Sequence, residues 1–324
     1  MIPPAEADPS LAFVFPGQGS QSPGMLAALG LRDVAVAEVF AEASDGAGVD
    51  LWALSQDPSD ARLDQTEFTQ PALLAAGVAV WRSWRAHGGA QPALFAGHSL
   101  GEYTALVAAG ALPLRDAARL VRLRGQLMQD AAPAGTGAMA AVIGADDAII
   151  AAACEAATDM PGMDGVVVPA NYNAPGQVVI GGHAEAVERA LALLAEQGVR
   201  KVVRLSVSAP SHTPLMREAA NRLSTAMADL PWAIPDRPIV QNADAEVHVG
   251  IASIRDALVR QLYLPVRWTG CMQAIADAGA TRVAECGPGK VLTGLARRID
   301  KSLDARAVGT PEELDRAIED WRQP

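Results

Sequence analysis

The apolar run Pro92-Ala93-Leu94-Phe95-Ala96 leads into Gly97-His98-Ser99-Leu100-Gly101, and Glu102-Tyr103-Thr104-Ala105-Leu106-Val107-Ala108-Ala109 follows. A strand, G-x-S-x-G and a helix in this order are typical of a nucleophile elbow. Glycine on both sides fits so sharp a turn, because a Cβ there would collide with neighbouring backbone. Backbone N–H groups and the positive end of the helix dipole would stabilise an oxyanion beside Ser99. The pattern therefore predicts acyl transfer through a serine ester, with an ordinary strand-to-helix turn and a capping serine as the alternative.

The composition indicates a globular protein with a sizeable core. The chain has 324 residues, of which 50% are hydrophobic and 19% charged, enough for one large domain or two smaller ones. We expect no membrane span, because no run of about 18 apolar residues is free of charges and proline. Residues 1–10 lack the basic and apolar regions of a signal peptide, so we expect a cytoplasmic location. The net charge of −11 argues against nucleic acid as a partner.

The three cysteines, Cys154, Cys271 and Cys286, are far apart and show no metal-ligand spacing. We interpret them as small buried residues in a reducing compartment, with a cysteine nucleophile as the weaker alternative.

Alternating strand and helix patterns predict an α/β fold with a mostly parallel, hydrolase-like sheet. The apolar run Leu11–Phe15 predicts a buried strand that ends at a glycine-rich loop, 16–21, which lacks the Walker lysine spacing and is equally consistent with a plain turn. Helices are expected up to about residue 84, with breaks near Asp45 and Pro58. Further helices are expected at 114–131, 214–230, 253–262, 267–278, from 290 and at 311–321, and further strands at 239–241 and 283–285.

Residues 135–208 have a pattern of their own. Strands are expected at 137–144, 165–173, 177–180 and 199–207, and helices at 146–157 and 184–197. The order βαββαβ predicts a ferredoxin-like small domain, inserted into a large catalytic domain formed by 1–134 and 209–324.

A nucleophilic serine needs a base, and His212 is the strongest of the five histidines. It lies in Ser208-Ala209-Pro210-Ser211-His212-Thr213-Pro214, directly after a predicted strand, in a loop stiffened by two prolines. His98 is a poor base because neighbours in such a turn point apart, but it can line the pocket. The others are weaker candidates: we expect His87 to be solvated, His183 to cap a helix, and His248 to lie in an acidic stretch. No acidic partner for the base can be chosen from the sequence.

Arg124 is a candidate for binding a carboxylate. It shares a predicted helix with Arg115, Arg119 and Arg122, and such charges usually form a solvated face. Its own surroundings, Leu123 to Met128, are rather apolar, and an inward-facing guanidinium could hold a carboxylate with two parallel hydrogen bonds.

Several motifs occur in one order, which is far more specific than any of them alone. They are Phe15-Pro16-Gly17-Gln18-Gly19-Ser20-Gln21, Gly97-His98-Ser99-Leu100-Gly101-Glu102, Arg124-Gly125, Asn171-Tyr172-Asn173-Ala174-Pro175-Gly176-Gln177, Pro210-Ser211-His212 and Gly287-Pro288-Gly289-Lys290. With them the chain resembles the malonyl-CoA:acyl carrier protein transacylases of bacterial type II fatty-acid synthesis, from Leu11 to Ile299.

The resemblance implies roles for individual residues. Ser99 matches the nucleophile, and His212 matches the base, which the family orients with a main-chain carbonyl near the position of Gln261. Gln18 and Leu100 match the oxyanion-hole positions, and Arg124 matches the arginine that pairs with the malonyl carboxylate. His98 would line the same substrate site.

The resemblance also implies a ping-pong reaction between malonyl-CoA and holo-acyl carrier protein, performed by a monomer without metal or redox cofactor. Because carrier proteins of this kind are acidic, we expect docking on a local basic patch. The candidates are Arg200, Lys201, Arg204, Lys290, Arg297, Arg298 and Lys301.

Three other functions stay open. An acyltransferase of polyketide synthesis or of malonate decarboxylation would share the motifs. A serine esterase or thioesterase would share the elbow but would not need Arg124. A non-catalytic protein with a degenerate site would not be expected to keep both Ser99 and His212.

Overall fold

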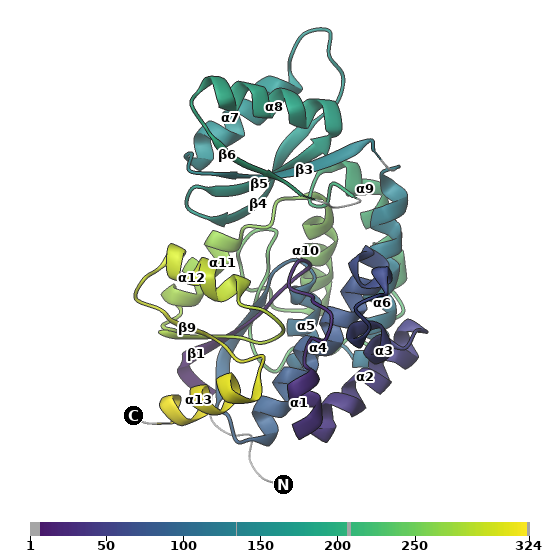
Figure 1. Ribbon diagram of the computed structural model, residues 1–324, viewed down its shortest axis with the longest axis vertical. Coiled ribbons are helices and arrows are strands. Elements are labelled where there is room, and N and C mark those ends of the chain that lie inside the picture. Colours follow the sequence, from purple (N-terminus) through teal and green to yellow (C-terminus); the bar gives the residue numbers. More distant parts are fainter. Residues whose placement is uncertain (1–6, 134, 206–208, 323–324) are drawn as a thin grey trace.

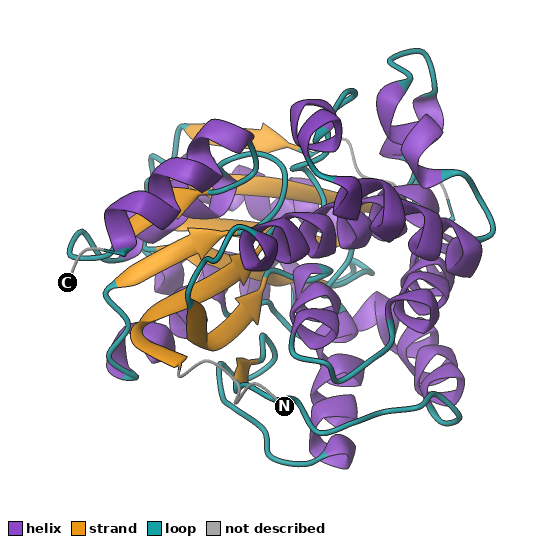
Figure 2. Ribbon diagram, turned by 90° about the horizontal axis from the view of Figure 1, so that it is seen from below, coloured by secondary structure: helices purple, strands orange, loops and turns teal. Residues whose placement is uncertain are grey.

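A five-stranded parallel sheet forms the centre of the larger lobe in the computed structural model, which describes residues 7–133, 135–205 and 209–322. Its strand order is β7-β2-β1-β8-β9, and every neighbouring pair is parallel. The strands are β1 (Ala7–Phe15), β2 (Gln91–Gly97), β7 (Ile239–Val240), β8 (Arg282–Glu285) and β9 (Asp304–Ala307). Figure 2 shows helices on both sides of these strands.

The alternation of side chains along β1 explains why this sheet is covered twice. Leu11, Phe13 and Phe15 point into one apolar cluster, and Ala12 and Val14 point into another. The first cluster is built with α2 (Val34–Ala47), α4 (Thr66–Ala86), α5 (Gly101–Ala108) and α6 (Leu114–Ala131), and the second with α11 (Trp268–Asp277) and α12 (Val291–Ile299). The predicted buried strand at Leu11–Phe15 is therefore confirmed.

A four-stranded antiparallel sheet forms the smaller lobe, at the top of Figure 1. Its elements are β3 (Gly137–Ile143), α7 (Asp147–Thr158), β4 (Val167–Ala174), β5 (Gln177–His183), α8 (Ala184–Glu196) and β6 (Lys201–Arg204). The spatial order β4-β5-β3-β6 is that of a ferredoxin-like sheet, and α7 and α8 cover one of its faces. The predicted fold class, a mostly parallel sheet with a ferredoxin-like insertion, is confirmed.

Some local predictions are wrong. Asp45 lies within α2, which continues to Ala47 and ends only where Gly48 adopts a φ of 66°. The last strand of the small lobe covers 201–204 rather than 199–207, although 206–208 are outside the described residues. β9 was not expected, because it is short and half of its residues are charged.

The remaining elements are α1 (Ala27–Arg32), α3 (Leu51–Gln56), η1 (Ala61–Asp64), η2 (Pro214–Met216), α9 (Arg217–Met227), α10 (Ile251–Tyr263) and α13 (Pro311–Trp321). α13 was predicted and begins with a capping box between Thr310 and Glu313. Within the described part of the chain, no helix has the length and apolar character needed to cross a bilayer.

Candidate active site

Ser99 sits at the apex of a sharp turn between β2 and α5, with a φ of 52°. A Cβ on Gly97 would lie 1.9 Å from the carbonyl carbon of Gly101, and a Cβ on Gly101 would lie 2.1 Å from the main-chain oxygen of Phe15. Because both obstacles are backbone atoms, neither glycine can be replaced without moving a strand or the helix. The turn has the geometry expected of a nucleophile elbow.

His212 is the histidine that the fold brings to Ser99. Its Nε2 lies 2.8 Å from Ser99 Oγ, and its Nδ1 lies 2.7 Å from the main-chain oxygen of Gln261. Since a carbonyl oxygen only accepts, Nδ1 carries the proton and Nε2 is left to accept the serine proton. Burial, and then the positive charge of Arg124, lower the pKa of His212 to about 3, which keeps the imidazole neutral at physiological pH.

Arg124 reaches the same point from the inner face of α6 and is 1% exposed. Its Nη2 donates to Ser99 Oγ at 3.1 Å and to Gln261 Oε1 at 3.0 Å, and its Nη1 donates to Gln70 Oε1 at 2.8 Å. All three partners that the described residues supply are neutral. The guanidinium therefore has no direct contact with an anion among the described residues, and an anionic ligand beside Ser99 would supply one and offset the cost of burying the cation.

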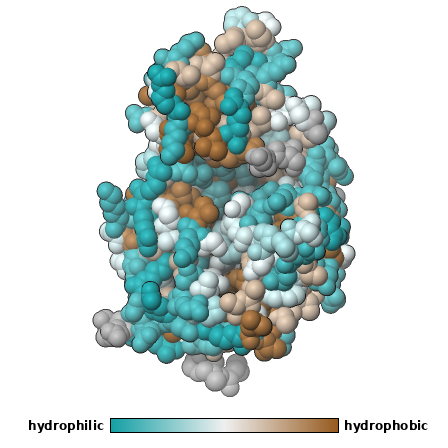
Figure 3. Space-filling model, viewed as in Figure 1, coloured by the Kyte–Doolittle hydropathy of each residue, from teal (hydrophilic) through white to brown (hydrophobic). Residues whose placement is uncertain are grey.

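A cavity of about 300 Å³ opens between the two lobes, and Ser99, His212 and Arg124 line it. Figure 3 shows the surface hollowed at this level, with hydrophobic residues gathered on the upper lobe above it. Gln18 and Leu100 also line the cavity, as does His98, whose Nε2 lies 2.8 Å from Asn173 Oδ1. The apolar part of the wall comes from Met139, Ala141, Val179, Leu205, Leu292 and Leu295. All predicted site residues except Gln261 therefore line one cavity, and Gln261 lies directly behind it.

Sequence reasoning missed Gln70, Asn242 and Glu102. Gln70 holds Arg124 from α4, and Asn242 Oδ1 accepts the N–H of Ser99 at 2.7 Å. Glu102 is fully buried and accepts a hydrogen bond from Gln261. Two signals were available in the sequence. Gln70 directly precedes a long apolar stretch, and Glu102 directly follows the elbow motif.

The other candidate side chains lie elsewhere. His87 contacts Asp33 at 2.8 Å, and His248 contacts Asp244 at 3.1 Å. His183 directly precedes α8, but its side chain makes no capping hydrogen bond, so the expected capping role is wrong; its Nδ1 accepts the N–H of Val166 instead.

The three cysteines are buried and free, and burial raises the pKa of each thiol, to about 12 for Cys154. These thiols lack the low pKa that a nucleophilic cysteine needs.

Comparison with known proteins gives one consistent family. The acyl transferase domain family matches residues 12–323. The malonyl CoA-acyl carrier protein transacylase of Salmonella typhimurium is 52% identical, over 95% of this chain and 98% of its own length. The crystal structure of the malonyl-CoA:acyl carrier protein transacylase of Xanthomonas oryzae pv. oryzae is 66% identical, with a TM-score of 0.95 over 98% of this chain and 99% of the other. A malonyl-transacylase in complex with a type II polyketide acyl-carrier protein is 48% identical, with a TM-score of 0.93 over 96% of this chain and 99% of the other.

Proposed function

The chain belongs to the family of malonyl-CoA:acyl carrier protein transacylases, and we propose that it transfers malonyl groups from CoA to a carrier-protein thiol through an ester on Ser99. The observation that carries the proposal is the meeting of three side chains. Ser99 Oγ lies 2.8 Å from the imidazole of His212 and 3.1 Å from the guanidinium of Arg124. One contact activates the oxygen as a nucleophile, and the other places a cation where an acid group on the acyl chain would lie.

In the first half-reaction, Ser99 Oγ attacks the thioester carbonyl while His212 Nε2 takes the hydroxyl proton. The main-chain oxygen of Gln261 holds Nδ1–H and stabilises the imidazolium that forms. Backbone N–H groups of Gln18 and Leu100 would stabilise the oxyanion. The C–S bond then breaks, and the sulfur of CoA leaves with the proton from His212.

In the second half-reaction, the thiol of the carrier's phosphopantetheine gives its proton to His212 and attacks the malonyl ester. The tetrahedral intermediate collapses, and Ser99 Oγ recovers the proton. Neither half-reaction oxidises or reduces any group, so the chemistry calls for no redox cofactor.

Arg124 accounts for the choice of malonyl over acetyl groups. A malonyl carboxylate beside Ser99 would pair with the buried guanidinium, whereas an acetyl group would give that cation no anionic partner in the cavity.

Intact-protein mass spectrometry after brief incubation with malonyl-CoA tests the proposal, with acetyl-CoA as the competing substrate and Ser99→Ala as the control. We expect a malonyl adduct on the wild-type chain alone and little adduct from acetyl-CoA. Release of CoA without an adduct would instead indicate a thioesterase, and absence of both would overturn the proposal.

We further propose that residues 135–208 form the small domain, and 1–134 with 209–324 the large one, in a monomeric cytoplasmic enzyme. The strands of the antiparallel sheet all lie between Gly137 and Arg204, which supports the division. A polyketide carrier is the second candidate acceptor, because one similar structure was solved with such a carrier. Transfer rates to purified carriers of both pathways would decide between them.

A further inference from the structure

A buried carboxyl group lies directly behind the nucleophile. Glu102, in the first turn of α5, is 0% exposed and does not line the cavity. It accepts three hydrogen bonds: from Gln241 Nε2 at 3.1 Å, from Asn242 N at 3.1 Å and from Gln261 Nε2 at 2.5 Å. All three partners are donors, so the cluster is built around an ionised carboxylate.

Asn242 connects this carboxylate to the elbow. Its side-chain Oδ1 accepts the N–H of Ser99 at 2.7 Å, and its Nδ2 donates to the main-chain oxygen of Gly97 at 2.8 Å. One amide thereby holds the backbone on both sides of His98, where the chain adopts its strained turn. Glu102 in turn holds the backbone N–H of Asn242.

Gln261 connects the same carboxylate to the other two groups of the site. Its Nε2 donates to Glu102 and to the main-chain oxygen of Ser99, so its Oε1 faces the guanidinium of Arg124. Its own main-chain oxygen accepts from His212. If the amide turned over, an N–H would face Arg124 and the contact would be lost.

Arg124 carries the charge opposite to that of Glu102, and Gln261 forms hydrogen bonds with both side chains. Burial raises the pKa of Glu102 to about 7, while its hydrogen bonds with Gln261, Asn242 and Gln241 and the charge of Arg124 act against that rise. The other titratable groups around it are Tyr103 on α5, Cys271 on α11 and, beyond Ser99, His212. Protonation of Glu102 would point an O–H at one of its three donors and break that contact.

We propose that Glu102 is a positioning residue, whose ionised carboxylate holds Asn242 and Gln261 in the arrangement that shapes the Ser99 elbow and orients Arg124 for acyl transfer. The proposal rests on the proposed function, since its readout is formation of the malonyl ester. It assigns no contact between Glu102 and the substrate.

The test is the single-turnover rate of malonyl-ester formation between pH 5.5 and 8.5. For the wild-type enzyme we expect the rate to fall as the pH drops below about 7, because Glu102 loses its charge there. We call this fall the limb of the pH profile. Glu102→Gln turns an amide N–H toward the existing donors, so we expect a rate about 10²-fold lower at pH 8.5 and no limb. A wild-type enzyme that forms no ester would overturn the proposed function itself. An ester formed by Glu102→Gln at the wild-type rate, with the limb retained, would overturn only the role of Glu102.

Gln241→Met provides a second test, which holds even if the Glu102→Gln variant does not fold. Among the residues that the structure describes, Gln241 Nε2 donates to Glu102 and to the main-chain oxygen of Ile254, and it has no hydrogen bond with Ser99 or Arg124. Loss of one donor makes the carboxylate harder to form, so we expect the limb to move to higher pH with the plateau rate retained. A limb that stays in place in this variant would contradict the proposal.

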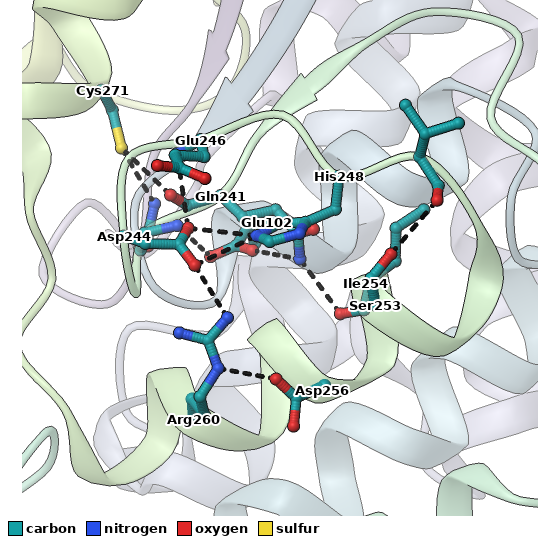
Figure 4. Close-up of polar contacts among 12 residues, drawn as sticks. Glu102, Gln241, Asp244, Glu246, His248, Ser253, Ile254, Asp256, Arg260 and Cys271 are labelled. Atoms are coloured by element: carbon teal, nitrogen blue, oxygen red, sulfur yellow. Dashed lines mark hydrogen bonds and ion pairs between the residues drawn. The ribbon is translucent and has the colours of Figure 1, made fainter.

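Asp244→Asn is the matched control on the same loop. Figure 4 shows Gln241 contacting Glu102 and, beside this contact, Arg260 of α10 bridging Asp244 and Asp256. The substitution weakens the tie between loop and helix without touching the Glu102 contacts. We expect the limb and the plateau rate of the wild-type enzyme. If Asp244→Asn lost both as Glu102→Gln does, general loosening of the loop would explain the effect and the proposal would fail.

Discussion

Ser99 and His212 share a rare backbone conformation, with φ values of 52° and 62°, and their side chains meet at 2.8 Å. Left-handed backbone at a residue other than glycine costs on the order of 1–3 kcal/mol and persists only where the surroundings impose it. At Ser99 the amide of Asn242 imposes it, and at His212 the backbone N–H donates to the main-chain oxygen of Leu262 at 3.0 Å. The two strained residues are therefore held by neighbouring parts of one support, the loop at Asn242 and the end of α10.

The elbow glycines test this support. In Gly101→Ala the new Cβ would meet the main-chain oxygen of Phe15 at 2.1 Å, so β1 or α5 must shift. We expect a loss of roughly 1–3 kcal/mol in the free energy of unfolding and loss of ester formation. Gly294→Ala is the matched control, because, apart from the backbone of α12 itself and the neighbouring residues in the chain, no atom of the described residues lies within 4 Å of its Cβ position. There we expect a gain of about 0.4–1 kcal/mol and unchanged activity. Chemical denaturation measures both, and an equal response of the two variants would contradict the argument.

The protonation of His212 is a second prediction. Burial and the charge of Arg124 hold its pKa near 3, whereas an unfolded histidine titrates near 6.5. The folded enzyme should therefore keep this imidazole neutral, and able to accept the serine proton, as the pH falls from 8 to 5. Ring ¹⁵N chemical shifts measure this directly. In Arg124→Ala the opposing cation is gone, so the pKa of His212 should rise; an unchanged titration would show that Arg124 does not influence the base.

How far the sequence predicts this site depends on how local each signal is. Ser99 lies between two glycines, a strand and a helix, and His212 follows a strand in a proline-stiffened loop, so the neighbours of each residue already indicate its role. The small lobe was predictable for the same reason, because its βαββαβ order lies within one continuous segment. Periodicity alone could not place Arg124 inside the protein, since three other arginines share its helix.

The support behind the site could not be predicted from local patterns. Glu102, Asn242 and Gln261 lie on different elements, and 140 and 159 positions separate the first from the other two. Their contacts exist only because the fold packs α5, the loop after β7 and α10 together. β9 was not predicted for a related reason: among the described strands its four residues pair with β8 alone, and their strand character depends on that neighbour.

Removal of Arg124 is the third prediction. Arg124→Ala takes away the cation that would pair with the malonyl carboxylate, and the loss of one partner of a buried pair costs about 3–5 kcal/mol. We expect malonyl-ester formation to fall by about 10²- to 10⁴-fold, and the preference over acetyl-CoA to fall with it. Competition between the two thioesters, read by intact mass, measures the preference. If malonyl transfer and its preference over acetyl were both retained, another group would have to bind the carboxylate.

The basic patch for the carrier protein remains a prediction. Among the described residues, three of the seven candidates, Arg200, Lys201 and Lys301, are exposed and have no polar side-chain partner, and the first two are adjacent in the chain. Arg204 pairs with Glu188 at 2.6 Å and Lys290 with Glu313 at 2.7 Å. Arg297 donates to the main-chain oxygen of Ala305, and Arg298 donates to Gln177 Oε1. Arg200 and Lys201 are exposed, and within the described part of the chain neither has a carboxylate at ion-pair distance. Lys201 begins β6 and Arg200 directly precedes it, and the other end of this strand leads to Leu205 in the cavity wall.

We therefore expect the double reversal Arg200→Glu and Lys201→Glu to raise the KM for the carrier protein. Each lost contact is worth about 1 kcal/mol in water, which together amounts to a rise of tenfold or more at low salt. The rise should shrink as added salt screens the charges, since the Debye length falls from about 10 Å at 0.1 M to about 3 Å at 1 M. Ester formation from malonyl-CoA should keep its rate.

Arg316→Glu is the control, because it reverses an exposed charge on α13, at the opposite end of the molecule in Figure 1. Carrier kinetics that respond equally to both changes would indicate a general charge effect, and kinetics that respond to neither would place the docking surface elsewhere.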